Sequence, residues 1–229
     1  NKAPVYVNAA SEGAKKIATL GSAQNNAQIQ TVSWQDIFSK IDLTDEGYLT
    51  LTFKGKKITT RFVGKHYIEV IALAWKVASQ YVSADQLAEA VADFEPSASF
   101  ITSYQLASET RVIDDGGTSN PQGFRALLSL VQEVAGKREV TIVTPGIVDL
   151  GDQSATIHTE LTRQMTGFAS TICYVGETEK DTVVSEGGKK VLTDQSEIIK
   201  HLSSLDKNAI VGIEGRMPAW VLTALEKKV

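Results

Sequence analysis

Residues 112–131 read VIDDGGTSNPQGFRALLSLV, and this stretch decides the fold class. An apolar run ends in Asp114 and Asp115, two glycines and small polar residues follow, and Asn120-Pro121 opens a helical pattern. Asn is a good helix cap and Pro suits the first helical position, so we expect a strand, a turn and a helix over 121–135. In α/β sheets ligands bind at such turns, because the helix amino terminus offers unpaired N–H groups.

The rest of the carboxyl half repeats this alternation of short apolar runs and helical patterns. We expect strands at 139–144, 170–176 and 209–213, and helices at 153–167, 194–205 and 218–228. Strands separated by helices predict right-handed crossovers and a parallel sheet covered on both faces. The carboxyl half is therefore predicted to be a Rossmann-like α/β domain with a mainly parallel sheet and flanking helices.

The amino-terminal part mixes several types of element. A strand at 4–8 and a helix from Ser11 come first, and alternating apolar residues between 28 and 63 predict antiparallel hairpins. Longer periods then predict two helices, at 66–82 and 84–94. FEPSAS at 94–99 interrupts the pattern, so we place a domain boundary there, with domains at 1–96 and 97–229.

Composition excludes several classes of protein. The net charge of −4 and the scattered lysine pairs provide no basic field for nucleic acid. No apolar run approaches the roughly 20 residues of a membrane span, so we expect a cytoplasmic protein. Cys173 is the only cysteine and lies in an apolar run, which predicts core packing. The chain begins without methionine, and we expect a fragment of a longer protein.

Chemistry alone leaves two interpretations of the turn at 112–124 open. Asp114 and Asp115 could accept hydrogen bonds from ribose hydroxyls or help to hold a magnesium ion, while the glycines allow a ligand to approach closely. Alternatively, this is only a strand-to-helix turn whose aspartates bond local amides. Arg216 is similarly open: it could clamp a carboxylate or phosphate, or be a solvated turn residue.

The stretch at 112–131 resembles V-x-D-D-S-Y-N-A-N-P-x-S-x-x-A-A-L, which opens the carboxyl-terminal domain of Mur ligases. The resemblance is closest to the branch that adds D-alanyl-D-alanine to a UDP-muramoyl tripeptide. Three further stretches resemble family motifs in family order: Gly64-Lys65-His66, VTPGIVDLG at 143–151 and AIVGIEGRMPAWVL at 209–222. The chain thus looks like the end of the central ATPase domain, with its antiparallel portion and two helices, followed by the complete carboxyl-terminal domain.

The resemblance implies ATP-dependent amide formation, in which a substrate carboxylate becomes an acyl phosphate that an amine attacks. ATP and magnesium would be the cofactors of the longer protein, and its partners a UDP-muramoyl peptide and an amino acid or dipeptide. By motif position, Asp115 would touch the ribose. The implied nucleotide pocket also includes Asp114, Thr118, Asn120 and His66; the implied substrate-binding residues are Thr144, Pro145, Gly146 and Arg216.

The departures from the family pattern support an alternative function. No G-x-x-G-K-[ST] loop occurs, so we expect the isolated chain to be inactive. Tyr67 and Val70 replace family asparagines, Phe100 falls where the family has arginine, and Glu214 replaces a lysine. These changes favour a ligase-derived binding or scaffold module without nucleotide chemistry. His158 and His201 fall within helices without partners at metal-ligand spacing, so we predict no metal site.

Overall fold

The computed structural model describes residues 4–25, 28–97, 99–117 and 119–226. The chain divides into two compact units. The first comprises Asn1–Thr44 and Tyr48–Glu95, and the second Asp45–Gly47 and Pro96–Val229.

The second unit contains a six-stranded, mainly parallel sheet. Its strands in chain order are β6 (Thr102–Gln105), β7 (Arg111–Asp115), β8 (Glu139–Thr144), β9 (Thr171–Tyr174), β10 (Val191–Leu192) and β11 (Ala209–Glu214). The spatial order is β10-β9-β8-β11-β7-β6, and only the edge strand β6 runs antiparallel to its neighbour. This arrangement confirms the predicted α/β fold.

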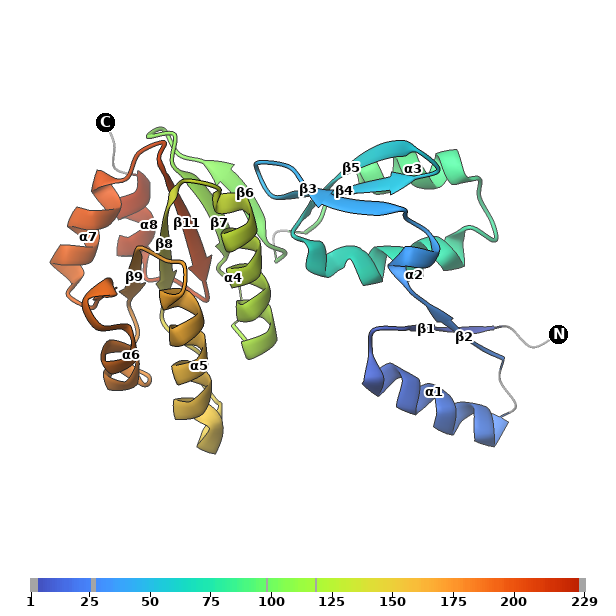
Figure 1. Cartoon of the computed structure of the whole chain (residues 1–229), viewed down its shortest axis with the longest axis horizontal. Helices are drawn as coiled ribbons and strands as arrows, with labels where there is room; N and C mark the ends of the chain where they lie inside the picture. The colour runs from blue at the N-terminus through green and yellow to red at the C-terminus, as the bar shows by residue number, and fades with distance from the viewer. Residues whose placement is uncertain (1–3, 26–27, 98, 118, 227–229) are drawn as a thin grey trace. The chain divides into compact units, whose positions relative to one another are not determined.

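Helices cover both faces of this sheet (Figure 1). They are α4 (Pro121–Ala135), α5 (Ser154–Thr166), α6 (Lys180–Gly187), α7 (Gln195–Ser204) and α8 (Ala219–Glu226). Val112, Val211 and Ile213 pack with apolar residues of α7 and α8 in one core cluster. Gly212 faces α4, where a Cβ atom would lie 2.9 Å from Val131 Cγ2. Successive strand residues therefore contact different helical layers, as the two-residue period of a strand requires.

Helix α4 begins and ends where its sequence signals predict. Asn120 Oδ1 accepts hydrogen bonds from the backbone amides of Gln122 and Gly123, at 3.1 and 2.9 Å. Pro121 occupies the first helical position, and Gly136, with φ of 61°, follows the last residue. The cap predicted at Asn120 is therefore confirmed.

The first unit contains two small sheets. Strands β3 (Lys40–Leu43), β4 (Tyr48–Phe53) and β5 (Lys56–Val63) form an antiparallel sheet, and α3 (Ala84–Asp93) packs against β5. Trp75 of α2 (Ile68–Ala78) is buried, with its ring 5.2 Å from that of Phe38. This aromatic contact lies in the core that joins the antiparallel sheet to its helices.

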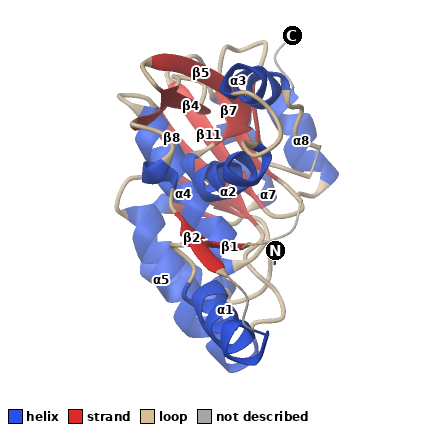
Figure 2. Ribbon diagram, turned by 90° about the vertical axis from the view of Figure 1, so that its right-hand side faces the viewer, coloured by secondary structure: helices blue, strands red, loops and turns tan. Residues whose placement is uncertain are grey.

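The second small sheet corrects the prediction that all strands between residues 28 and 63 are antiparallel. β1 (Val5–Asn8) and β2 (Ile29–Val32) pair in parallel. The helix between them, α1 (Glu12–Asn25), provides the long crossover that a parallel pair requires. Figure 2 shows this pair between α1 and α2, both of which pack against β1.

Apolar side chains beside β1 and β2 remain exposed. Val5, Ile17 and Leu20 are 44, 73 and 67% exposed. Val5 and Ile17 line a cavity of about 380 Å³ whose other walls are Val7, Ala14, Ala18, Gly21 and Ile29. The apolar surface beside this pair is therefore only partly covered by α1 and α2. Among the described residues, no helix is long and apolar enough to cross a membrane.

Candidate functional site

Three neighbouring strands of the second unit end at one edge of the sheet. β7 ends at Asp115, β8 at Thr144 and β11 at Glu214. Glu214 lies opposite Asp115 in the parallel register, and Ile213 lies opposite Val143. The turns that follow these strands therefore converge, as expected at the carboxyl edge of an α/β sheet.

Asp114 is held by its own turn. The backbone amide of Gly116 donates to Asp114 Oδ1 at 2.8 Å, and the hydroxyl of Tyr104 donates to Oδ2 at 3.4 Å. Burial raises the pKa of Asp114, and both hydrogen bonds act against this shift. A Cβ atom at Gly116 would lie 2.7 Å from Asp114 Oδ1, so a larger residue there would displace this carboxylate. Local hydrogen bonding of an aspartate, one of the two alternatives for the turn, is thus present.

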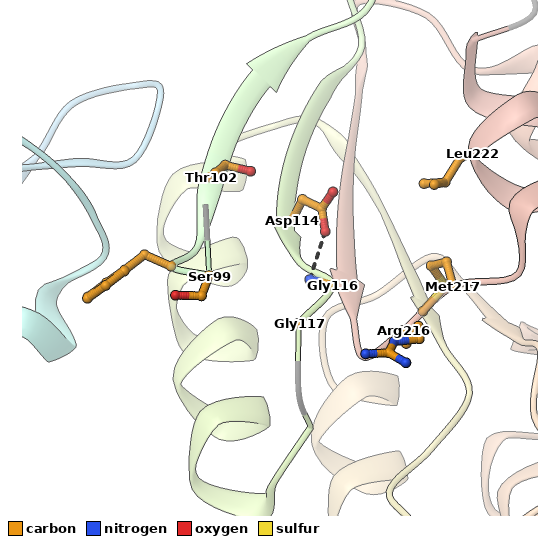
Figure 3. Close-up of a pocket in the computed structure, with 9 residues that line it drawn as sticks. Ser99, Thr102, Asp114, Gly116, Gly117, Arg216, Met217 and Leu222 are labelled. Atoms are coloured by element: carbon orange, nitrogen blue, oxygen red, sulfur yellow. Dashed lines mark hydrogen bonds between the residues drawn. The ribbon is translucent and has the colours of Figure 1, made fainter. Parts of the chain in front are cut away.

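Asp114 also lines a pocket of about 300 Å³, which we call the Asp114 pocket. Figure 3 shows Asp114 from β7, Leu222 from α8, and Arg216 and Met217 from the turn after β11 around one space. The remaining walls are Ser99, Phe100, Thr102, Gly116 and Gly117. The pocket thus combines a carboxylate that accepts hydrogen bonds, a guanidinium that pairs with anions, and apolar walls.

Asp115 belongs to the opposite face of the sheet. Adjacent strand residues point to opposite faces, so Asp115 is directed away from the Asp114 pocket, toward the side of α4. Burial raises the pKa of Asp115, and the nearby charge of Asp114 adds to the shift. Of the residues implied for nucleotide or substrate binding, the pocket lining contains Asp114 and Arg216.

Glu214 is a functional candidate that the sequence presented only as a departure from the family pattern. Its side chain is fully buried, and Oε1 accepts a hydrogen bond of 2.7 Å from the hydroxyl of Ser119. Burial raises the pKa of Glu214 to about 8; the Ser119 bond opposes this, and the charge of Asp115 adds to it. One signal was available in the sequence: a carboxylate ends the otherwise apolar strand AIVGIE. Its partner Ser119, 95 positions earlier, carried no signal.

The implied substrate residues Thr144, Pro145 and Gly146 lie at the end of β8 and in the tightly packed turn that follows it. Thr144 and Gly146 are buried, and the Gly146 amide donates to Thr144 Oγ1 at 3.0 Å. Gly146 has φ of 80°, and a Cβ atom there would lie 2.2 Å from the hydroxyl oxygen of Tyr174. Val148, a residue that the sequence did not single out, is 66% exposed. The exposed part of this turn therefore begins at Val148, after the three residues that were expected to bind substrate.

His158 supports the same turn from α5. Its Nε2 accepts a hydrogen bond of 3.1 Å from the Ile147 amide, and its Nδ1 lies 2.8 Å from the carbonyl oxygen of Ser154. These contacts require a neutral ring with the proton on Nδ1, which donates to the carbonyl. His158 is 2% exposed, so its role in this structure is to position the turn.

The other implied residues occupy separate places. Asn120 caps α4, Thr118 lies outside the described residues, and His66 belongs to the first unit. His66 lies at the surface, with its ring 3.9 Å from that of Tyr67. Within the described part of the chain, no group of three or more His, Cys, Asp and Glu side chains could hold a metal ion.

Comparison of folds identifies solved structures that share this architecture. MurF from Acinetobacter baumannii is 19% identical with a TM-score of 0.73, over 97% of this chain and 51% of that one. MurF from Thermotoga maritima in complex with ADP is 14% identical with a TM-score of 0.71, over 99 and 53%. MurC from Thermotoga maritima is 13% identical with a TM-score of 0.60, over 85 and 44%.

No family model matches the chain, and no curated protein matches it either. At the identities above, the likeness shows that the chain has the fold of Mur ligases. The chain spans about half the length of the solved MurF chains.

Proposed function

We propose that this chain is the distal part of an ATP-dependent Mur-like ligase. The parent would join an amino acid or dipeptide to a UDP-linked muramoyl peptide in peptidoglycan synthesis, and the isolated chain would be inactive. One observation carries the proposal: the turn that resembles the family motif lies at the carboxyl edge of a sheet with the MurF fold, and there it lines the Asp114 pocket. Of the residues that the resemblance implies, Asp114 and Arg216 line this pocket, and we assign the ribose contact to Asp114 in place of Asp115.

The pocket has the donors and acceptors that a nucleotide requires. The Asp114 carboxylate would accept hydrogen bonds from ribose hydroxyls, and the Arg216 guanidinium would pair with phosphate. Met217 and Leu222 supply apolar surface on the same side. Bound ATP would supply the phosphoryl group that activates the substrate carboxylate. The described residues lack a three-ligand set for magnesium, so we assign no magnesium ligand to this chain.

The exposed apolar residues of the first unit support the idea of a longer parent. Val5 of β1 and Ile17 of α1 are exposed and line one cavity beside the two-stranded parallel sheet, and Leu20 of α1 is exposed as well. In the proposed parent, further strands of the ATPase domain would extend this sheet and bury these side chains. The ADP-bound MurF structure is about twice as long as the region it shares with this chain, which leaves room for such strands.

Calorimetric titration of the chain with ADP tests the nucleotide assignment. Asp114→Ala removes a charged acceptor and should weaken ADP binding by about 10- to 100-fold, the range for a lost hydrogen bond to a charged group. Asp149→Asn is the matched control, because Asp149 is exposed outside the pocket and has φ of 62°, which Asn tolerates. Equal affinity of the Asp114→Ala and wild-type chains would remove Asp114 from the nucleotide site.

A second function, a ligase-derived binding module without nucleotide chemistry, is favoured by one observation. Glu214 is buried at the carboxyl edge where the family has lysine, so the positive charge expected there is replaced by an acid. Such a module would not bind ADP in the wild-type chain, even at millimolar concentration. ADP binding that depends on Asp114 would exclude the module.

A further inference from the structure

Glu214 is a buried acid at a position of β11 where the fold would accept an apolar residue. The other residues of β11 are apolar or glycine, and all six residues are buried. Oε2 of Glu214 is buried and has no hydrogen-bond partner among the described residues. An unsatisfied buried carboxyl oxygen destabilises a protein, and an apolar side chain of similar size would avoid this cost. The feature therefore calls for a functional explanation.

The hydrogen bond from Ser119 to Glu214 connects the two turns that line the Asp114 pocket. Ser119 comes shortly after Gly116 and Gly117, which form one wall, and Glu214 directly precedes the turn that carries Arg216 and Met217. The 2.7 Å bond between Ser119 Oγ and Glu214 Oε1 thus joins the carboxylate side of the pocket to its guanidinium side.

Two further contacts show how closely these turns pack. The Gly215 amide donates to the carbonyl oxygen of Asp115 at 3.1 Å. Gly215 has φ of 86°, and a Cβ atom there would lie 3.2 Å from Pro145 and 3.5 Å from Ser119 Cβ. Glu214 is therefore at the point where the turns after β7, β8 and β11 meet.

We propose that Glu214 is a positioning residue, which acts through Ser119 to hold the two turns of the Asp114 pocket in their ligand-binding conformation. It touches no ligand itself, because its side chain is fully buried. This inference rests on the proposed function for its ligand, ADP. It also makes a claim about the turns that is independent of any ligand, since the Ser119–Glu214 bond should restrain them in the free chain.

Four single variants of the chain test the proposal. Ser119→Ala removes the donor and Glu214→Met removes the acceptor, whereas Glu214→Gln keeps an acceptor oxygen for Ser119. Thr110→Val is the matched control: Thr110 is fully buried and donates to the Asp206 carbonyl oxygen at 2.9 Å, just before the start of β7. It removes this bond and the 2.9 Å bond that Thr110 accepts from the Ser108 hydroxyl, both at the edge of the sheet remote from the pocket.

Two readouts are measured for each variant: the dissociation constant for ADP, and the hydrogen-exchange rates of the Gly116 and Gly215 amides. Ser119→Ala and Glu214→Met should each raise the dissociation constant and both exchange rates about three- to tenfold, the effect of one lost hydrogen bond. Glu214→Gln and Thr110→Val should remain within about twofold of wild type. If Glu214→Met fails to fold, Ser119→Ala tests the same bond from its other end.

Three outcomes would overturn the proposal. The exchange rates of Glu214→Gln could rise as much as those of Glu214→Met, or those of Thr110→Val as much as those of Ser119→Ala. The third outcome is that Ser119→Ala leaves both exchange rates unchanged. If the wild-type chain does not bind ADP, the proposed nucleotide site fails. The exchange rates of Gly116 and Gly215 then decide by themselves whether Glu214 positions the turns. The two failures are thus distinguishable.

Discussion

Replacing Glu214 by glutamine should change how the stability of the second unit depends on pH. Glu214 is fully buried, and burial, with a smaller contribution from the Asp115 charge, raises its pKa from 4.5 to about 8. Between these values the folded chain binds a proton that the unfolded chain has released. Stability therefore falls as pH rises through this range, because the unfolded state binds fewer protons than the folded state.

The magnitude follows from the two pKa values. From 4.5 to about 8, at about 1.36 kcal/mol for each pH unit, the wild-type chain should lose about 5 kcal/mol of stability through this group. Glutamine keeps the acceptor for Ser119 and does not titrate. The Glu214→Gln variant should therefore resemble wild type near pH 5 and become progressively more stable than wild type toward pH 9.

Urea unfolding of the full chain, followed by pulse-labelling hydrogen exchange, measures this effect. Peptides that cover β8 and β11 report on the second unit separately from the first. Glu160→Gln is the control, because the Glu160 side chain is 57% exposed and pairs with Arg125 at 2.8 Å. The free energy of unfolding of this variant should differ from that of wild type by less than about 1 kcal/mol at every pH. Parallel stability curves for wild type and Glu214→Gln between pH 5 and 9 would refute the reasoning.

Three other predictions concern the turn after β8, the cap of α4 and the small parallel sheet. Gly146→Ala should lower the free energy of unfolding in urea by at least about 2 kcal/mol, because Gly146 has a positive φ and the Tyr174 hydroxyl lies close to it. Gly136 also has a positive φ but has open space around it, so Gly136→Ala should lower the free energy of unfolding by only about 1 kcal/mol. Asn120→Ala should lose about 1 kcal/mol in the same assay, and Asn120→Asp nearly nothing; equal losses would contradict a capping role. Amides of β1 and β2 should exchange at least about tenfold faster than those of β8 and β11, and uniform protection would count against an incompletely covered sheet.

The sequence predicts elements best where independent signals coincide. Asn120 and Pro121 mark the start of α4, and the structure has the predicted helix over Pro121–Ala135. α6, by contrast, was missed, because Val183 and Val184 are the only large apolar residues in its eight positions. β10 has two residues, too few to establish a period. The parallel pairing of β1 and β2 was missed because alternation shows that a segment is a strand and leaves its partner open.

The site was only partly predictable, since its geometry depends on strand register. The sequence indicated the carboxylates at the end of β7 and Arg216 after β11, and the structure brings Asp114 and Arg216 into one pocket. The bond between Ser119 and Glu214 joins residues 95 positions apart, and it exists only because β7 and β11 are neighbours in a defined register. No local pattern in the sequence contains this information.

The alternation of side chains along β7 gives two adjacent aspartates different roles. Asp114 points toward the α8 side and lines the pocket, whereas Asp115 points toward the α4 side, where its charge raises the pKa of Glu214. A one-residue shift in the register of β7 would exchange these environments. The Ser119–Glu214 bond and the Gly215–Asp115 bond both oppose such a shift. If the proposed positioning role holds, the buried acid helps to keep Asp114, and not Asp115, in the lining of the Asp114 pocket.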